Sequence, residues 1–348
     1  MASSMHVRNT KTTLADISKV TQVSINTVSK VLSGQAKAAR ISDKTIKKVQ
    51  KAAKELGYIP NLIARDLRAK QTGIIGVFIA DMADSNYAKI AQIVLQRLHD
   101  KGYRPLLSVA EIGLELCWQE WLLNRIQGLI LCGTTDRMDN QFFHLLHQHA
   151  MTAVIAGCAY KPLQNQKKIP GLDVSSVSMD NYAGMDLAIH HLRQQNHRRI
   201  AYITGPGWHT DAYERQMAYE NIIRQYHEPI LAEQGTDTAF WQRGYNGMRE
   251  LQHRGQSFDA VLAYDDITAI GAMKWLQENK RKIPEDVAIV GVDNAPESEY
   301  TTPALTTISL PTEAIGEKAV VLLESRLFAQ SPVEKILIMP SLIPRASA

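Results

Sequence analysis

The stretch "ISKVTQVSINTVSKVL", residues 17–32, decides how the N-terminal part of the chain folds. It contains two short runs with apolar residues at helical spacing, separated by a break at residues 21–24. A hydroxyl side chain that can cap a helix precedes each run, Thr13 for the first and Ser24 for the second. The apolar residues expected on the inner faces are Leu14, Ile17 and Val20 in the first helix, Val28, Val31 and Leu32 in the second, and Val23 in the turn. The pattern therefore predicts two short helices joined by a tight turn.

A third helix is expected from Ser42, which can cap it, to about Leu56, with Gly57 ending it. Three small helices with this turn make a helix-turn-helix head, predicted over residues 1–60. In such heads the N-terminal residues of the second helix reach base edges in the major groove. The outward residues at that point are Ile25, Asn26, Thr27, Ser29 and Lys30.

Asn26 is the candidate base reader, because its amide can pair with adenine through two hydrogen bonds, and Ile25 could touch a thymine methyl group. The alternative is that Asn26 is a solvated helix residue and Ile25 covers the core. Residues 1–72 carry fourteen Lys/Arg against four Asp/Glu, a net charge of +10, so the chain's total of +4 leaves −6 for the rest. A basic head on an acidic body favours a polyanionic partner, although a solvated lysine-rich helix face would give the same charge.

From Gly73 the pattern changes to an alternation of apolar strands and amphipathic helices. "GIIGVFIA", residues 73–80, is a nearly continuous apolar run, typical of a buried parallel strand. Helices are predicted at about 86–101, 111–125 and 139–149, and in a second series that begins near Val174 at 181–194, 210–226, 239–253 and 266–279. This α/β alternation predicts two doubly wound parallel-sheet lobes with a ligand cleft at the carboxyl ends of the strands.

Other functional classes find little support. Residues 1–12 are polar, which argues against a signal peptide, and no apolar stretch approaches the roughly 20 residues that cross a bilayer. Cys117, Cys132 and Cys158 are odd in number and widely spaced, so we expect reduced core residues in a cytoplasmic protein. "GPG" at 205–207 lacks phosphate-loop spacing, and neither HExxH nor G-x-S-x-G occurs. The sequence predicts no enzyme activity, no metal site (His144, His147 and His149 included) and no cofactor.

Two long stretches carry a resemblance to a known family. "TLADISKVTQVSINTVSKVLSG", residues 13–34, and "ISDKTIKKVQKAAKELGYIPNLIARDL", residues 41–67, resemble the DNA-binding head of the LacI/GalR family of bacterial repressors. Ser18 departs from the family's usual alanine. "VAIVGVDNAPES" (287–298) and "PALTTISLP" (303–311) are similar to the family's strings in a body of periplasmic-binding-protein type, so the resemblance covers about residues 12–345.

The resemblance implies that residues 61–72 form a hinge that becomes helical on operator DNA, with Leu67 wedged into the minor groove. The alternative is that Leu67 packs against the body. Asp66 departs from the usual small or neutral residue, and its charge near phosphates predicts weaker minor-groove binding. The full set of candidate DNA contacts is Thr13, Ser24, Ile25, Asn26, Thr27, Ser29, Lys30, Asn61, Ala64, Leu67 and Arg68.

The family's body crosses between its lobes three times, and we place the crossings near residues 177, 306 and 332. The expected effector-binding and dimerisation domain, residues 73–345, then divides into an N-lobe and a C-lobe. The N-lobe is expected to hold residues 73–177 and 306–331, and the C-lobe residues 178–305 and 332–345.

Candidate effector contacts also follow from the resemblance. Arg215 matches the arginine of the family's R-x-x-[GA]-[YW], and Asp293 the aspartate of "GVDN". Asp265 stands where sugar repressors often have asparagine, although it could instead cap the helix at 266. Asn86 and Tyr87 occupy positions that are often aromatic. Trp208, Phe240 and Trp241 could supply stacking faces, with Trp208 alternatively at the surface or an interface. An arginine, carboxylates and aromatic faces suit a sugar or sugar derivative.

The prediction is a sequence-specific DNA-binding transcriptional regulator, a repressor controlled by a small polar effector. Its expected partners are a pseudo-palindromic operator in double-stranded DNA and a second copy of the chain. The segment "ILIMPSLIPRASA" shows no leucine heptads, so a homodimer is expected. The alternative is a sugar-binding transport-type protein without a DNA function.

Overall fold

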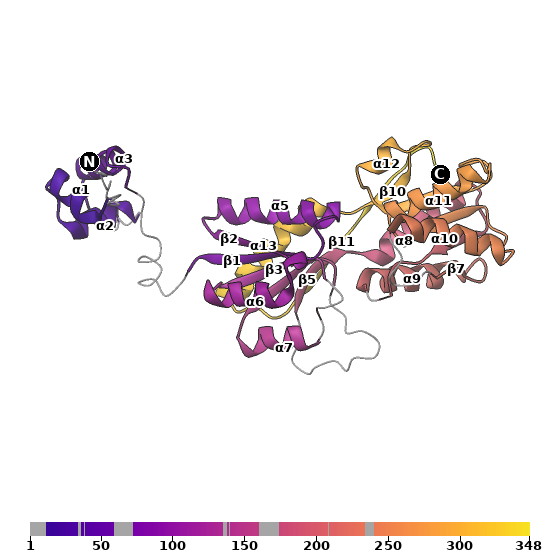
Figure 1. Ribbon diagram of the computed structural model, residues 1–348, viewed down its shortest axis with the longest axis horizontal. Helices are drawn as coiled ribbons and strands as arrows, with labels where there is room; N and C mark the ends of the chain where they lie inside the picture. Colours follow the sequence, from indigo (N-terminus) through magenta and orange to yellow (C-terminus); the bar gives the residue numbers. More distant parts are fainter. Residues whose placement is uncertain are drawn as a thin grey trace, which may run out of the picture. The chain divides into compact units, whose positions relative to one another are not determined.

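The computed structural model describes residues 12–33, 36–37, 39–58, 72–134, 138, 140–159, 174–207, 209–233 and 240–348. The chain divides into two compact units, residues 1–72 and residues 73–348 (Figure 1). The predicted hinge contacts, Asn61, Ala64, Leu67 and Arg68, lie outside the described residues, as do Asp66 and Trp208.

The first unit contains α1 (Leu14–Thr21), α2 (Ile25–Leu32) and α3 (Asp43–Glu55). Each begins at the predicted cap. Thr13 forms a capping box with Asp16, while Ser24 and Ser42 each accept a hydrogen bond from the backbone three residues on. The turn after α1 is fastened by Ser18, whose hydroxyl donates to the carbonyl of Val23 at 2.6 Å. The departure from alanine therefore adds a hydrogen bond inside the helix-turn-helix unit.

The head buries a small apolar core. Its buried members are Ile17, Val28, Val31, Ala36, Val49, Ala52 and Ala53. The prediction was wrong for Val20, which is 60% exposed. Thr21, one helical turn beyond Ile17, takes the inner position instead, because its hydroxyl can donate to the Ile17 carbonyl at 2.7 Å and is thereby satisfied inside the core.

The second unit has two lobes, each built on a six-stranded sheet (Figure 1). The first sheet has the order β11-β5-β4-β3-β1-β2 and is parallel throughout. Its strands are β1 (Ile74–Ile79), β2 (Arg104–Val109), β3 (Gly128–Cys132), β4 (Thr152–Gly157), β5 (Ser175–Met179) and β11 (Lys335–Ile338). Its helices are α5 (Ser85–Asp100), the short η1 (Ala110–Ile112), α6 (Leu114–Leu123), α7 (Asn140–Gln148) and α13 (Thr312–Phe328). In Figure 1, α5 lies above the strands and α6 and α7 lie below them.

The second sheet has the order β12-β10-β9-β8-β6-β7 and is parallel except for β12. Its strands are β6 (Ile200–Ile203), β7 (Ile230–Ala232), β8 (Ala260–Ala263), β9 (Ala288–Asp293), β10 (Thr306–Ser309) and β12 (Ser341–Ile343). Its helices are α8 (Asn181–Gln194), α9 (Thr210–Ile223), α10 (Phe240–His253), α11 (Asp266–Glu278) and α12 (Glu297–Tyr300). The predicted fold class, a helical head with two doubly wound lobes, is confirmed.

The predicted crossings near 177, 306 and 332 are a few residues too early. β5 stays in the first sheet, so the first crossing follows Met179, and β10 belongs to the second sheet. β11 pairs with β5 and returns to the first sheet before the chain crosses again to β12. Prolines mark the last two crossings, because Pro311 follows β10 and Pro340 follows β11, and proline has no N–H to continue a ladder.

Within the described part of the chain, none of the helices combines the length and apolar character that crossing a bilayer demands. The three cysteines are buried and carry no disulfide, as expected for core residues. Burial raises the pKa of the Cys132 thiol to about 12, so it remains protonated and unreactive at neutral pH.

Helices α10 and α11 pack unusually closely, and two glycines permit it. A Cβ added at Gly244 would overlap the carbonyl oxygen of Thr268, and one added at Gly271 would overlap the carbonyl oxygen of Trp241. Both obstacles are helix backbone, which cannot rotate away as a side chain can. Gly184 in α8 differs, because a Cβ there would meet its nearest neighbours at an ordinary 3.4–3.5 Å.

Gly244→Ala should therefore lower the free energy of unfolding by about 2 kcal/mol or more, because α10 must move off α11. The matched control Gly184→Ala should be neutral or stabilising by up to about 1 kcal/mol, since alanine favours the helix. Urea unfolding of the full chain, followed by circular dichroism, measures both. Equal effects of the two substitutions would contradict the backbone contact.

Candidate functional site

The start of α2 presents polar and apolar side chains to solvent, as predicted. Asn26 and Lys30 are exposed, while Thr27 and Ser29 are half-buried. Ile25 is 51% exposed and lies outside the head's core, so the alternative in which it covers the core is wrong. The exposed start of α2 is therefore free to meet another surface.

Thr13 and Ser24 are engaged within the head. The Thr13 hydroxyl lies 2.7 Å from the Asp16 carboxylate, and that bond lowers the pKa of Asp16. The Ser24 hydroxyl accepts from the Thr27 N–H at 3.2 Å and shares a 2.8 Å hydrogen bond with the Thr27 hydroxyl. Their first role is to start α1 and α2, which fixes the direction in which Asn26 projects.

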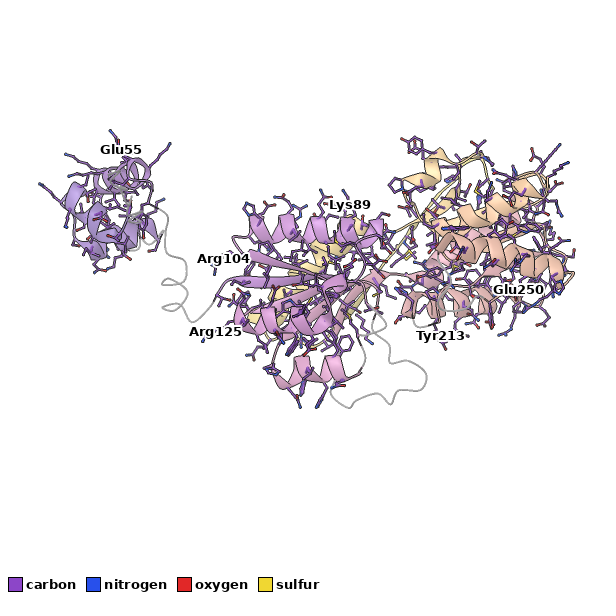
Figure 2. The ribbon with its side chains drawn as sticks, in the orientation of Figure 1. Glu55, Lys89, Arg104, Arg125, Tyr213 and Glu250 are labelled. Carbon is purple, nitrogen blue, oxygen red and sulfur yellow. The ribbon has the colours of Figure 1, made fainter. Side chains whose placement is uncertain are left out.

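Helix α3 carries a large share of the lysines of the head. Its exposed lysines are Lys44, Lys47, Lys48, Lys51 and Lys54. Lys51 pairs with Glu55 at 3.8 Å, and Glu55 points outward at the end of the helix (Figure 2). A pair this exposed is worth little, so the lysines retain their capacity to bind phosphate groups.

In the second unit, a cavity of about 420 Å³ lies where the carboxyl ends of both sheets meet. Every part of its described wall is the last residue of a strand or lies in the segment that follows one. The residues on the side of the first sheet are Ala80, Asp81, Asp84, Asn86, Tyr87, Ala110, Glu111, Leu114, Thr134 and Gly157. Those on the side of the second sheet are Pro206, His209, Asp211, Arg215, Tyr264, Asp265, Asp293 and Leu310. Five of the six predicted effector contacts are thus brought together.

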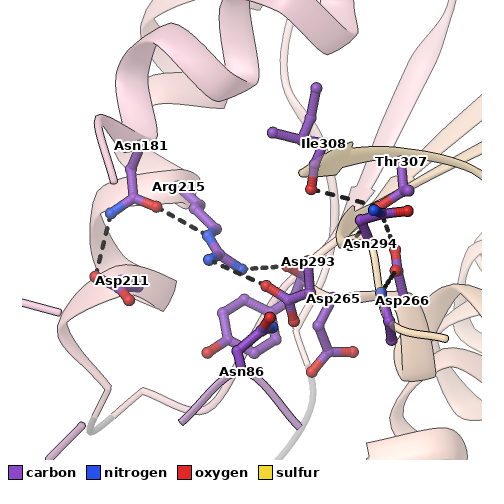
Figure 3. Close-up of polar contacts among 12 residues, drawn as sticks. Asn86, Asn181, Asp211, Arg215, Asp265, Asp266, Asp293, Asn294, Thr307 and Ile308 are labelled. Carbon is purple, nitrogen blue, oxygen red and sulfur yellow. Dashed lines mark hydrogen bonds and ion pairs between the residues drawn. The ribbon is translucent and has the colours of Figure 1, made fainter. Parts of the chain in front are cut away.

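Arg215 anchors the wall on the side of the second lobe (Figure 3). It is only 4% exposed, and its Nε donates to Asn181 Oδ1 at 2.9 Å. Its Nη1 donates to the backbone carbonyl of Tyr264 at 2.7 Å, and its Nη2 lies 3.7 Å from the Asp293 carboxylate. Burial opposes its charge, but Asp293 and other neighbours hold the pKa of Arg215 above its ordinary value. The guanidinium is therefore permanently charged and fixed in place.

Asp265 both lines the cavity and caps α11, since it accepts from the Thr268 N–H at 2.6 Å. The alternative of a capping role is confirmed without excluding the other role. Burial raises the pKa of Asp265, of Asp84 and, to a greater extent, of Asp293 above the ordinary value.

Asp266, behind the wall, holds the loop after β9. It accepts from the Thr307 hydroxyl at 2.5 Å and from the Ala295 N–H at 2.7 Å (Figure 3). Burial raises the pKa of Asp266 to about 7. Through these two bonds Asp266 fixes the turn that carries Asp293.

A hydrogen bond between Tyr87 and His209 joins the lobes inside the cavity. The hydroxyl of Tyr87, on α5, lies 2.8 Å from Nε2 of His209, which precedes α9. Nδ1 of His209 accepts from the Asp211 N–H at 3.3 Å, so Nε2 carries the proton and donates to Tyr87. Burial first, and then the charge of Arg215, lower the pKa of His209 to about 4, which keeps the ring neutral at physiological pH.

Glycines at the ends of strands leave room for the two tyrosine rings of the cavity. A Cβ at Gly133 would overlap the ring of Tyr87, and one at Gly205 would overlap the ring of Tyr264. Gly133 also has a φ of +82°, which favours glycine. The close approach of the Tyr87 ring to Gly133 fixes the Tyr87 hydroxyl at the contact between the lobes.

The prediction that Trp241 contacts the effector was wrong. This residue lies outside the cavity wall and is 55% exposed at the start of α10, where its carbonyl packs against Gly271. The side chains of Trp208 and Phe240 lie outside the described residues. The aromatic faces of the described wall are instead those of Tyr87 and Tyr264.

His209, Tyr264, Asp211 and Asp84 were not among the predicted contacts. The expectation that the cleft lies at the carboxyl ends of the strands could have found them, since each lies in the segment that follows an apolar strand. Among the described residues, no cluster of His, Cys, Asp and Glu is arranged to hold a metal ion. The cavity offers a buried cation, several carboxylates and two tyrosine faces, an arrangement that binds a small polar molecule.

The chain is similar to proteins of known function over nearly its whole length. Residues 13–61 match the family model "Bacterial regulatory proteins, lacI family", and residues 189–348 match that of a periplasmic binding protein-like domain. HTH-type transcriptional regulator CelR of Thermobifida fusca is 30% identical over 95% of this chain and 96% of its own. The ribose operon repressor of Escherichia coli is 28% identical over 97% and 99%.

Two solved structures share the fold. A lac repressor dimer bound to operator and an anti-inducer has a TM-score of 0.80 at 25% identity, covering 97% of this chain and 99% of that one. A CelR–cellobiose complex has a TM-score of 0.68 at 27% identity, covering 97% and 100%. With a regulator 30% identical over nearly its full length, the chain belongs to the LacI family of bacterial regulatory proteins.

Proposed function

We propose that this protein is a transcriptional repressor that binds a pseudo-palindromic operator as a homodimer and is controlled by a small polyol. The observation that carries the proposal is the presence in one chain of two features. One is a helix-turn-helix head with an exposed recognition helix start, and the other is a two-lobed body that encloses a polar cavity. A transport-type binding protein needs only the second feature, so the head argues against that alternative.

In this proposal Ile25, Asn26, Thr27, Ser29 and Lys30 meet the major groove. Thr13 and Ser24 place the helices against the phosphates, and residues 61–72 form the hinge in the minor groove. Asn86, Tyr87, Arg215, Asp265 and Asp293 hold the effector. The relatives are regulators, and we infer that this chain likewise performs no catalysis and works in the cytoplasm, where the operator is.

The coupling needs two arrangements of the lobes. A ligand between them shifts DNA affinity only through its different affinities for those arrangements. The Tyr87–His209 bond belongs to the arrangement described here, and a ligand that binds beside it changes how firmly the lobes hold together.

The direct test is to select fragments of the source genome on the purified full chain and to sequence them. Enrichment of a shared pseudo-palindrome supports the proposal. Enrichment that follows base composition alone, with no shared site, would contradict it.

Asn26→Ala should weaken binding to the selected operator by about 1–3 kcal/mol, because one adenine loses its two hydrogen bonds. Affinity for scrambled DNA should stay nearly constant. Gln50→Ala, on the exposed face of α3, is the matched control and should change neither. Fluorescence anisotropy on both DNAs measures the effect, and an equal loss on scrambled DNA would show that Asn26 does not read a base.

Arg215→Ala should abolish release from the operator by the effector, while operator affinity without effector stays within a few-fold. It should also cost about 3 kcal/mol of stability, because Asn181 and Asp293 lose a buried partner. Arg224→Ala, near the end of α9 and exposed, should respond normally. An Arg215 variant that responds at unchanged effector concentration would place the effector elsewhere.

The lowered pKa of His209 should make the free energy of unfolding fall as the pH falls. The unfolded ring has a pKa near 6.5 and the folded ring one of about 4, so the unfolded state binds the proton more readily. The neutral ring of His209 therefore contributes about 3 kcal/mol to the free energy of unfolding above about pH 6.5. This contribution is lost as the pH falls to 4. His209→Asn, which can still cap α9, should flatten the unfolding free energy between pH 7 and 4. An unchanged slope would mean that the ring is protonated in the folded protein.

A further inference from the structure

We propose that the effector is a cation, a small polyol that carries a protonated amine. The inference rests on the proposed function, since it assigns the chemical class of the ligand held in the same cavity. It is carried by the composition of the cavity wall and by the hydrogen bonds that its groups have already made.

The described wall carries a large excess of negative side chains. Its acidic residues are Asp81, Asp84, Glu111, Asp211, Asp265 and Asp293. Arg215 is the one cation among the described wall residues, and Asn181, the Tyr264 carbonyl and Asp293 already engage its guanidinium. Arg243, buried behind the wall, acts on Asp265 and offsets one more charge. After both arginines are counted, the acidic residues of the described wall still outnumber its cations.

Hydrogen-bond capacity gives a second argument. Oδ1 of Asp84 accepts from the N–H groups of Asn86 and Tyr87, and Oδ1 of Asp265 accepts from that of Thr268. A carboxylate offers about four acceptor positions, so capacity remains at both residues, and no carboxylate can donate. A sugar hydroxyl donates once but brings two lone pairs of its own that need donors. An ammonium group donates three times and accepts nothing, which matches a wall rich in acceptors.

The tyrosine rings of the wall also favour a cationic ligand. Tyr87 and Tyr264 are each less than one-tenth exposed and lie on opposite sides of the cavity. The faces of such rings attract cations, most strongly where water is excluded. The guanidinium of Arg215 already lies 5.0 Å from the centre of the Tyr264 ring, so this environment accepts positive charge.

Mutual repulsion among the carboxylates works in the same direction. Burial raises the pKa of Asp293 well above its ordinary value, and the charges of Asp84 and Asp265 add to the rise against the opposing charge of Arg215. A bound cation relieves that repulsion, a neutral ligand leaves it, and an anion increases it. We therefore expect sugar phosphates and sugar acids to bind more weakly than an amine.

The experiment uses the full chain and matched probes in the gluco, galacto and manno series. In each series it compares the free hexose, the 2-amino-2-deoxy hexose, its N-acetyl derivative and the uronic acid by calorimetry at neutral pH and low salt. The free amine should bind at least about tenfold tighter than the parent and the N-acetyl sugar in one or more series. Tighter binding by a neutral or acidic member, or no binding by any free amine, overturns the proposal.

Asp265→Asn tests the origin of the preference. Asparagine is a good helix cap, so the start of α11 is kept while one charge is removed. The ratio of amine to N-acetyl affinity should fall about tenfold. Glu285→Gln removes the same charge at an exposed position away from the wall and should leave the ratio unchanged. An unchanged ratio in Asp265→Asn, or an equal fall in both variants, overturns the role given to the wall.

Operator binding distinguishes a failure of the charge assignment from a failure of the proposed function. A chain that selects an operator and is released from it by a neutral sugar contradicts the charge assignment alone. A chain that binds amino sugars but selects no operator contradicts the proposed function and leaves the charge assignment intact.

Discussion

A buried guanidinium is the constraint on which the body of this protein depends. Arg215 reaches from α9 to Asn181 at the start of α8, to the Tyr264 carbonyl after β8 and to Asp293 at the end of β9. An ionised group this deeply buried is tolerated only where each of its donors finds an acceptor. The need to satisfy Arg215 therefore fixes the start of α8 and the ends of β8 and β9 relative to one another. It also gives the carboxylates of the cavity their one fixed positive neighbour in the described wall.

The two lobes are joined by crossings of the chain, and buried apolar residues of both lobes belong to one cluster. Three crossings of the chain connect the sheets, and the Tyr87–His209 bond adds a contact inside the cavity. A neutral hydrogen bond is worth about 1 kcal/mol net, so a ligand of ordinary affinity can outweigh it. Rigid strand ends within each lobe and a weak contact between lobes are what a ligand-controlled equilibrium requires.

The sequence predicted elements and strand ends well, but not what depends on packing between elements. Arg215 and Asp293 were found by resemblance, and both lie in the wall because they follow apolar strands. His209 obeys the same rule, yet its importance comes from Tyr87 in the other lobe, which no local pattern reveals. The prediction for Trp241 was wrong because its position beside Gly271 depends on the packing of α10 on α11, which no local pattern reveals. The crossings were misplaced because an apolar run does not state which of two sheets it joins.

In the head, two exposed apolar residues lower the stability that the local sequence pattern would otherwise give. Its caps, its core and the Ser18 hydrogen bond all agree with the local pattern, yet Ile25 and Val20 remain half exposed or more. Each leaves apolar area in water that a more stable head would bury, at about 25 cal/mol per Å². Places where a sequence breaks its own local rules are commonly functional. We propose that the isoleucine at the first position of α2, beside Asn26, is such a place, because the free protein gains nothing from its exposure and a thymine methyl group in a bound groove would cover it.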